Sequence, residues 1–324
     1  MATASAALFD SGKGGGTAIG EREQLSSVIN RIDPVETPLY SNAKKEVVKG
    51  VFHEWQVQDL AAAAENAVNE GADANYAAAT PTTRHGNYCQ IGQKSVSVSD
   101  TLDVTDKAGR DREVAYQKSL KGMELRKDIE KSLVSDRARS GTDPRYAGTF
   151  SSWITNASIS TAGTTSALPA GTGADIPTFA GNDRALTLAL IDEAMIAAYN
   201  DGGQPDMLVL SPTNKVNFSD LSSGSVSTNQ INYTAPREAA IVGSVSLYLS
   251  DFGELSVVID RAMANDRAFL IDSDHYSIGA LTGRNFKVNT IGKTGDSTQF
   301  QIVNEWTVKC TPKAHGAVYD LSGS

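Results

Sequence analysis

The chain has 324 residues and a formal net charge of −9; 40% of its residues are hydrophobic and 21% are charged. These values are typical of a soluble globular protein, and the length suffices for one large domain or two smaller ones. The acidic balance argues against sequence-specific nucleic-acid binding through a broad basic face, although a local basic stripe can still touch DNA. No apolar run reaches the roughly 20 residues that span a bilayer, so no membrane partner is expected.

The first part of the chain is polar and poor in groups that pack. Residues 1–45 are rich in Gly, Ser, Ala and Thr, and one short helix is expected over about 21–30. Pro34 and Pro38 then keep the backbone extended or turning. Much of the first hundred residues therefore looks unable to bury itself on its own chain, as is typical of arms that hold neighbouring subunits.

A long strand excursion follows. Residues 51–57 and 94–99 both alternate between apolar and polar side chains, which predicts two strands. We expect them to pair as one antiparallel excursion with a partly helical tip, and to need a partner, because a two-stranded ribbon is marginal alone in water. Residues 59–80, between them, are nearly half alanine and contain no Lys or Arg; their acids are Asp59, Glu65, Glu70 and Asp73.

A long charged helix is predicted over about 111–139, and it would span roughly 40 Å. Its apolar positions fall into two stripes on opposite sides, so the helix should be sandwiched between two layers. Gly141 and Pro144 stop it. The first stripe holds Val114, Leu125, Ile129 and Leu133, and the second holds Tyr116, Leu120, Met123 and Val134.

The rest of the chain predicts a loop-rich insertion, a small α/β unit and a run of strands. Residues 141–182 have Trp153 and Ile154 as their one large apolar pair. A helix over about 183–199 precedes the apolar strand 207–210, which should be buried on both faces. Ser211 and Pro212 are typical of an N-cap and first helical position, and the segment after 245 is mostly strands.

No chemical motif accompanies these elements. The four histidines, His53, His85, His275 and His315, are far apart, and none has a second His or Cys at the spacing of a zinc motif. Gly292–Thr294 resembles the end of a P-loop, but Lys287 stands where the first glycine should be. We therefore predict no catalytic, cofactor or metal site, and no enzyme. The two cysteines, Cys89 and Cys310, are too few for a disulfide framework and favour a reducing compartment.

Several segments, in order along the chain, resemble the major capsid proteins of tailed bacteriophages that have the Hong Kong 97-type fold. None of them is a chemical motif, and together they are spread over most of the chain. They are Asn30–Pro34 with Thr37–Leu39, Phe52–Gln56, Gly86–Ile91, Leu208–Pro212, Ser250–Gly253, Lys293–Asp296, Asn304–Val308 and Lys313–Gly316.

The resemblance implies an α+β fold with a defined set of parts. Residues 1–48 would be the N-terminal arm and 49–103 the extended β-hairpin loop. The peripheral domain would take 104–182 and 266–324, with the helix at 111–139 as its spine, and the axial domain would be 183–265. The resemblance gives no role to the insertion at 141–182.

The resemblance also implies a function. The chain would assemble through pentamers and hexamers into an icosahedral shell around the phage genome, with scaffold, portal and decoration proteins as further partners. It would be located in the virion capsid and assembled in the cytoplasm of the host bacterium, and it would touch packaged double-stranded DNA without sequence preference.

Charge suggests where subunits meet. We expect the acidic tip of one copy to lie across a basic part of a neighbour, for instance its spine helix; the alternative is that both are ordinary solvated faces, or that the helix faces DNA. Exposed ion pairs contribute only about 0–1 kcal/mol each, so their role would be register and orientation. The contact candidates are Trp55, Glu65, Glu70, Asp73, Arg112, Lys118, Lys121, Arg126 and Lys127, and the basic stretch also includes Lys107 and Arg110.

Three other classes of protein remain as alternatives. An encapsulin-like nanocompartment shell would share the fold and differ in its cargo. A soluble hydrolase or binding protein would use a pocket at the α/β unit and remain monomeric or dimeric. A fibre or adhesin fits the long charged helix less well. The state of assembly separates the shell proteins from the others, and the content of the particle separates the two kinds of shell.

Overall fold

The computed structural model describes residues 35–74, 76, 78–106, 109, 111–160, 166–179, 183–225, 246–293 and 295–322. The helix expected over 21–30 lies outside these residues. The described helices are α1 (Pro38–Asn42), α2 (Asp100–Val104), α3 (Glu113–Leu133), α4 (Phe150–Trp153), α5 (Leu188–Asn200) and α6 (Pro212–Ser225), with a 3-10 turn at Pro312–Ala314.

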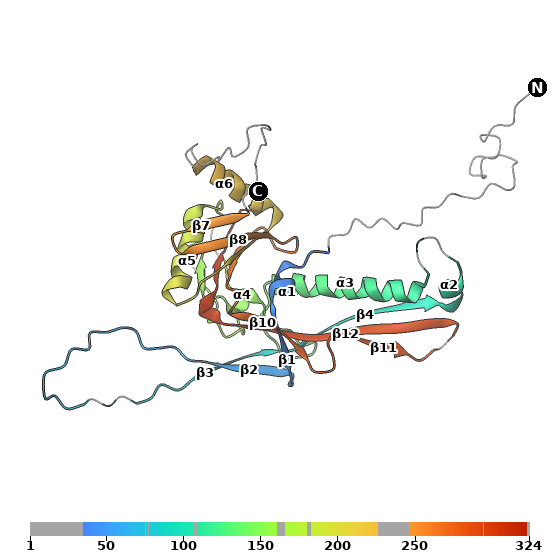
Figure 1. Ribbon diagram of the computed structural model, residues 1–324, viewed down its shortest axis with the longest axis horizontal. Helices are drawn as coiled ribbons and strands as arrows, with labels where there is room; N and C mark the ends of the chain where they lie inside the picture. The colour runs from blue at the N-terminus through green and yellow to red at the C-terminus, as the bar shows by residue number, and fades with distance from the viewer. Residues whose placement is uncertain are drawn as a thin grey trace, which may run out of the picture.

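The strands form three sheets (Figure 1). The first has five strands, β1 (Lys44–Val48), β10 (Tyr276–Leu281), β12 (Ser297–Cys310), β11 (Lys287–Ile291) and β4 (Gln90–Ser99), of which β4 pairs with β12. The second has the order β5 (Asn156–Ser158), β13 (Gly316–Val318), β9 (Ala268–Ile271), β6 (Met207–Leu210), β8 (Gly253–Ile259) and β7 (Leu247–Ser250). The third is the hairpin of β2 (Phe52–Val57) and β3 (Thr83–Tyr88).

The molecule is elongated because these parts lie end to end. Helix α3 runs along the five-stranded sheet beside β4 and β12, and the β2–β3 hairpin projects from the other end of that sheet (Figure 1). The six-stranded sheet sits to one side of the body with α5 and α6. An α+β fold is confirmed.

The expected pairing of 51–57 with 94–99 is wrong. β2 pairs with β3, from Phe52–Tyr88 to Val57–Thr83. β4 instead pairs with β12 along its whole length, from Ser99–Ser297 to Gln90–Trp306. The strand Thr83–Tyr88 has a Gly and several polar residues, so it lacks the apolar alternation that marks a strand.

The partly helical tip is also wrong for the described part of the excursion, which contains no helix between Gln58 and Thr82. Alanine favours a helix, but a short helix in water needs an apolar face to pack. These alanines meet no partner surface within the subunit, because the described residues from 58 to 82 are exposed.

The long helix is present but ends earlier than predicted, at Leu133 rather than near 139. Leu125, Ile129 and Leu133 are buried and Val114 is half-buried, so the first predicted stripe faces the core. In the second stripe Tyr116, Leu120 and Met123 are only half-buried, and Val134, beyond the helix, is buried. The helix is therefore fully covered on one side only within this subunit.

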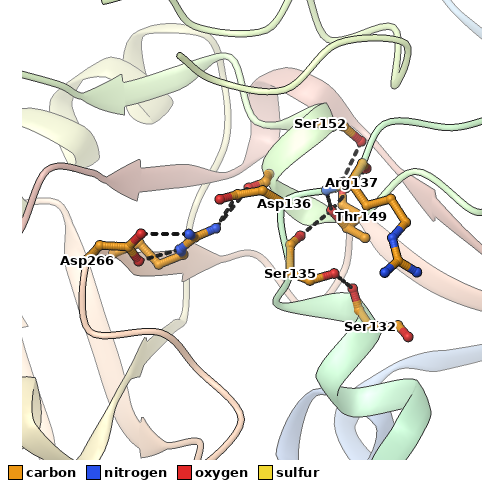
Figure 2. Close-up of polar contacts among 9 residues, drawn as sticks. Ser132, Ser135, Asp136, Arg137, Thr149, Ser152 and Asp266 are labelled. Atoms are coloured by element: carbon orange, nitrogen blue, oxygen red, sulfur yellow. Dashed lines mark hydrogen bonds and ion pairs between the residues drawn. The ribbon is translucent and has the colours of Figure 1, made fainter. Parts of the chain in front are cut away.

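A polar junction explains the early end of α3. The Thr149 hydroxyl donates to the backbone carbonyl of Ser135 at 2.5 Å, and the backbone amide of Arg137 donates to the Thr149 hydroxyl at 3.3 Å (Figure 2). These contacts satisfy backbone groups that would otherwise continue the helix. The buried Arg267, just before β9, pairs with Asp136 and Asp266, so the junction ties the end of α3 to the six-stranded sheet.

The six-stranded sheet is packed on both faces. All four residues of β6 are buried, as predicted, and the amide of Asn214 donates to the Ser211 hydroxyl at 3.3 Å, which confirms the N-cap of α6. Leu208 and Leu210 pack with α5 and α6, whereas Met207 and Val209 face the core that includes α4 and the end of α3. The sheet takes β5, β9 and β13 from outside the range 183–265.

The core of the body centres on Trp153, which is fully buried. Its ring centroid lies 5.1 Å from that of Trp55, at the root of the hairpin. Gly173 has a positive φ of 76°, and a Cβ there would stand 2.5 Å from the Trp153 ring, so only glycine fits. The predicted anchor of the 141–182 insertion, Trp153 with Ile154, is therefore confirmed as buried.

Replacing Trp153 by alanine should lower the free energy of unfolding by about 3–5 kcal/mol, because it opens a large cavity where three parts of the fold meet. Denaturant unfolding followed by circular dichroism measures the change. Trp153→Phe, which keeps a ring, should lose less; equal losses for both variants would contradict this account.

The buried His315 should make the subunit sensitive to acid. Its Nδ1 accepts the backbone amide of Asp272 at 3.0 Å, and burial lowers the pKa of His315 from 6.5 to about 4. The unfolded chain therefore binds a proton between pH 6.5 and 4 that the folded chain does not, so the free energy of unfolding falls as pH drops. The loss from this group should approach roughly 3 kcal/mol at pH 4. His315→Gln should show a shallower fall over that range; an unchanged slope would exclude His315 as the cause.

Candidate subunit interface

The loop between β2 and β3 is the part of the described chain least attached to its own subunit. Leu60, Val68 and Tyr76 are 95%, 79% and 91% exposed. The described side-chain contacts of the loop lie near its root, where the Lys313 ammonium binds the Asp59 carboxylate at 2.6 Å and Gln58 donates to the carbonyl of Thr80 at 3.4 Å. Three large apolar side chains on one exposed loop make the loop a candidate contact surface.

The acidic residues predicted as contacts lie on this loop. Glu65, Glu70 and Asp73 are exposed, and among the described residues none of them has an ion pair or hydrogen bond. Asp59 alone is engaged, by Lys313. The loop thus presents negative charge that no ion pair within the described part of the subunit neutralises.

Trp55, the aromatic contact candidate, lies elsewhere. Its side chain is 8% exposed and stacks among His53, His85 and Trp153, with ring centroids 5.7, 6.5 and 5.1 Å away. Burial lowers the pKa values of His53 and His85, which keeps both rings neutral near pH 7. Trp55 therefore holds the root of the hairpin to the body, and its burial argues against a direct contact with a neighbour.

The spine helix α3 and its N-cap present less free positive charge than the sequence suggests, because carboxylates pair with two of the basic side chains. Arg112 pairs with Asp103 at 3.3 Å, and Lys121 pairs with Glu124 at 2.8 Å. Lys118 lies 5.3 Å from the ring centroid of Phe300, and Arg126 lies 5.7 Å from that of Phe286. Lys127 is exposed, and Lys107 and Arg110 are outside the described residues.

A carboxylate that sequence reasoning missed fixes the start of the described chain. The two oxygens of the buried Glu130, on α3, accept the backbone amides of Leu39 and Tyr40 at 2.7 and 2.8 Å. Burial raises the pKa of Glu130 to about 7, while the two amides act in the opposite direction. The Tyr276 hydroxyl donates to the Leu39 carbonyl at 3.1 Å, so both the amide and the carbonyl of Leu39 are hydrogen-bonded to side chains of the body.

This contact of Glu130, called the Glu130 clasp below, fixes Leu39 and Tyr40 of α1 to α3. No pattern in the sequence distinguishes Glu130 from the other charged residues of α3, and the contact joins residues about ninety positions apart. The helical period alone offers a signal, since Glu130 follows Ile129 on the buried side.

The described residues contain no group of three or more His, Cys, Asp or Glu able to hold a metal ion. In the same part of the chain, none of the helices has the length and hydropathy required to cross a membrane. The described surface features that could contact another molecule are the acidic loop, the exposed edge of β1 and the exposed side of α3.

The architecture defines the class of protein: an elongated body with a spine helix over a sheet, a projecting hairpin and a second sheet packed with helices is the Hong Kong 97-like capsid fold. The capsid subunit of cyanophage A-1(L) has this fold, with a TM-score of 0.66 and 15% identity over 93% of this chain and 97% of that one. The SrpI encapsulin of Synechococcus elongatus is similar too, with a TM-score of 0.54 and 10% identity over 91% and 94% of the two chains.

Sequence places the chain more narrowly. The model of the SU10 major capsid protein family matches residues 10–322, and the chain belongs to that family. The major capsid protein of Escherichia phage Phieco32 is 36% identical over 141 residues, which is 40% of this chain and 40% of that protein. The match spans less than half the length of this curated relative. Family membership gives the chain a structural role in a virion capsid.

Removing the Glu130 clasp should loosen the start of the described chain. Glu130→Ala leaves two backbone amides without an acceptor, at a cost of about 2–4 kcal/mol in the free energy of unfolding. Glu130→Gln keeps one acceptor oxygen and should lose about half as much. Denaturant unfolding and limited proteolysis near Pro38 measure the effect. A proteolysis rate in Glu130→Ala equal to that of the unaltered chain would argue that the clasp does not hold this segment.

Proposed function

We propose that the chain assembles through rings of five and six copies into a closed icosahedral shell that encloses the DNA genome of a tailed phage. The single observation that carries the proposal is the loop between β2 and β3, which exposes Leu60, Val68 and Tyr76 almost completely. Their burial requires a second molecule, and in a shell of identical subunits that molecule is a neighbouring copy.

The mechanism rests on many weak contacts. Each loop adds a modest contact, and a closed lattice multiplies it, so the shell is stable although single contacts can still break and re-form during assembly. Repeated heterologous contacts of this kind close into rings when the rotation fits. Assembly would occur in the bacterial cytoplasm, and scaffold, portal and decoration proteins would be partners of the same lattice.

Charge supports an ordered contact between copies. The unpaired acids Glu65, Glu70 and Asp73 would meet a basic part of the neighbour, and exposed spine-helix cations such as Arg126 and Lys127 are candidates. Exposed ion pairs of this kind contribute about 0–1 kcal/mol each, so they would fix register more than affinity. The spine helix could instead face packaged DNA and hold it without sequence preference.

An encapsulin-like shell is the second candidate, and the likeness to the SrpI encapsulin favours it. The fold does not separate the two, because the likeness is in the subunit and not in the cargo. The match to the SU10 family favours the phage shell. Particles that contain DNA would support the phage shell, and particles that contain a cargo enzyme would support the alternative.

Reversing Glu65 and Glu70 to lysine should reduce shell formation while the subunit stays folded. Both side chains are exposed and make no contact within the described subunit, so the melting temperature should not change. Sedimentation and negative-stain microscopy measure the yield of shells or capsomers.

Asp251→Lys with Glu254→Lys controls for the change in net charge, since Asp251, in the turn between β7 and β8, and Glu254, near the start of β8, are both exposed. Glu65→Gln with Glu70→Gln should have a smaller effect than the reversal. A shell yield equal to that of the unaltered chain after the reversal would remove the acidic loop from the contact. Failure of the unaltered chain to form any shell or capsomer would count against the proposed function itself.

A further inference from the structure

β1 forms one edge of the five-stranded sheet. Among the described residues it pairs only with β10, in parallel register from Lys44–Ser277 to Val48–Leu281. Val47 is 71% exposed and Val48 is 1% exposed. A free edge can add a further strand, and lysines on it discourage uncharged strands from doing so. Lys44 and Lys45 therefore leave this edge open to an acidic strand.

The two faces of the sheet differ at this edge. A hollow of about 310 Å³ lies on the face to which Val47 points, and a hollow of about 390 Å³ lies on the face to which Lys44 and Glu46 point. The first is largely apolar and the second is charged. The first hollow is lined by Tyr40, Val47, Ile278, Ala280 and Trp306, and the second by Lys44, Glu46, Asp274, Ser277 and Lys309.

The charged hollow has a surplus of positive charge. Lys44 pairs with Asp274 at 2.7 Å, and Lys309 lies 3.8 Å from Glu46. Lys45 and Glu46 line both hollows, and the Lys45 ammonium lies 3.5 Å from the centre of the Tyr40 ring. Three lysines thus face two carboxylates, and one added carboxylate would balance them.

The loop has the complementary pattern. In an extended chain, Leu60, Ala62, Ala64 and Val68 share one face, while Asp59 and Glu65 share the other. Residues 59–68 contain no proline and make no backbone hydrogen bond with the described part of their own subunit. The apolar face of the loop matches the apolar hollow, its acidic face matches the charged hollow, and its unpaired backbone groups match those of the β1 edge.

We propose that residues 61–70 of one copy add as a strand to the free edge of β1 in a second copy, with Val68 beside Val47 and Glu65 facing Lys44 and Lys309. Backbone hydrogen bonds would supply most of the affinity, and the two hollows would fix the register through alternate side chains. This inference rests on the proposed function and names the receiving surface for the loop.

A charge exchange tests the pairing. Glu65→Lys should raise the subunit concentration needed for shells by about tenfold, because every subunit in the lattice loses the same contact. Lys309→Glu should do the same, and the double variant Glu65→Lys with Lys309→Glu should recover most of the yield. The matched control is Lys127→Glu on the spine helix, combined with Glu65→Lys.

Each outcome of the exchange decides between the surfaces. Rescue by Lys309→Glu but not by Lys127→Glu supports the β1 edge. Rescue by Lys127→Glu alone would place the loop on the spine helix and overturn the inference. A Glu65→Lys variant that assembles like the unaltered chain would overturn it as well. If the unaltered chain assembles in none of these experiments, the proposed function fails, and not this contact alone.

A cysteine pair gives a test that does not depend on charge. Val47→Cys and Val68→Cys introduce two exposed thiols, while the native Cys89 and Cys310 are buried. Partners in adjacent strands lie within the roughly 4.4–6.8 Å between Cα atoms that a disulfide requires. Oxidised glutathione should therefore link subunits of assembled shells into covalent ladders on a non-reducing gel.

The control for this test is Val216→Cys with Val68→Cys, since Val216 is also exposed, at 61%, but lies on α6. Ladders in the Val47 pair and not in the control support the inference. A link within one chain would show that the loop folds back on its own β1, and equal ladders in both pairs would show contact without this register; either result overturns it.

Discussion

The contact between Trp55 and Trp153 joins the hairpin to the hydrophobic core of the body, and the described residues from 58 to 82, beyond the hairpin strand β2, are exposed. On the body side, Trp153 is fully buried among residues from α4, the hairpin and the segment around Gly173. On the other side, the loop exposes its few large apolar groups. Ordering an extended segment costs roughly 1–2 kcal/mol per residue in backbone entropy. Within the described residues, contacts of the loop with its own body lie only near Gln58 and Asp59, and in the proposed shell association with a neighbour would offset that cost.

Buried ion pairs join the separate parts of the body to one another. The buried Glu305 on β12 accepts Arg145 at 3.0 Å and Arg284 at 2.8 Å, and Arg267 joins the end of α3 to the six-stranded sheet. Breaking buried pairs of this kind is costly, since it leaves a charge without a partner. The spine helix, the two large sheets and the root of the hairpin therefore hold fixed positions, and weak contacts at the periphery add to a rigid frame.

The sequence predicted the elements that carry their own periodicity. Leu125, Ile129 and Leu133 mark the buried side of α3, the apolar run Met207–Leu210 marks β6, and Ser211 marks the start of α6. It did not predict the partners of the strands, because pairing depends on packing far along the chain. The polar strand β3 shows no alternation, and the serines of β4 fit a surface ribbon as well as the sheet position beside β12 that they occupy. The helix predicted for the alanine-rich tip is absent for a related reason. The helix propensity of alanine is too weak to form a short helix without a surface for the helix to pack against.

The candidate interface was predictable in its charge and not in its geometry. The acids of the loop stand out in the sequence because no Lys or Arg interrupts them. Their exposure follows from the lack of a nearby apolar face. The burial of Trp55 and the pairing of Arg112 and Lys121 depend on side chains from other elements, which spacing along one helix does not show. The Glu130 clasp is of the same kind.

The free edge of β1 shows how one set of charges can both prevent and permit assembly. A subunit made in many copies is exposed to pairing of identical edges, which would lead to open aggregates. Two β1 edges repel each other because each carries Lys44 and Lys45, whereas an acidic strand with an alanine-rich, apolar face meets no such penalty. Specificity of this type comes from the disfavoured pairing as much as from the favoured one. In the proposed contact, the negative charge of the loop and the positive charge of the β1 edge together direct each free edge to the loop of a neighbouring copy.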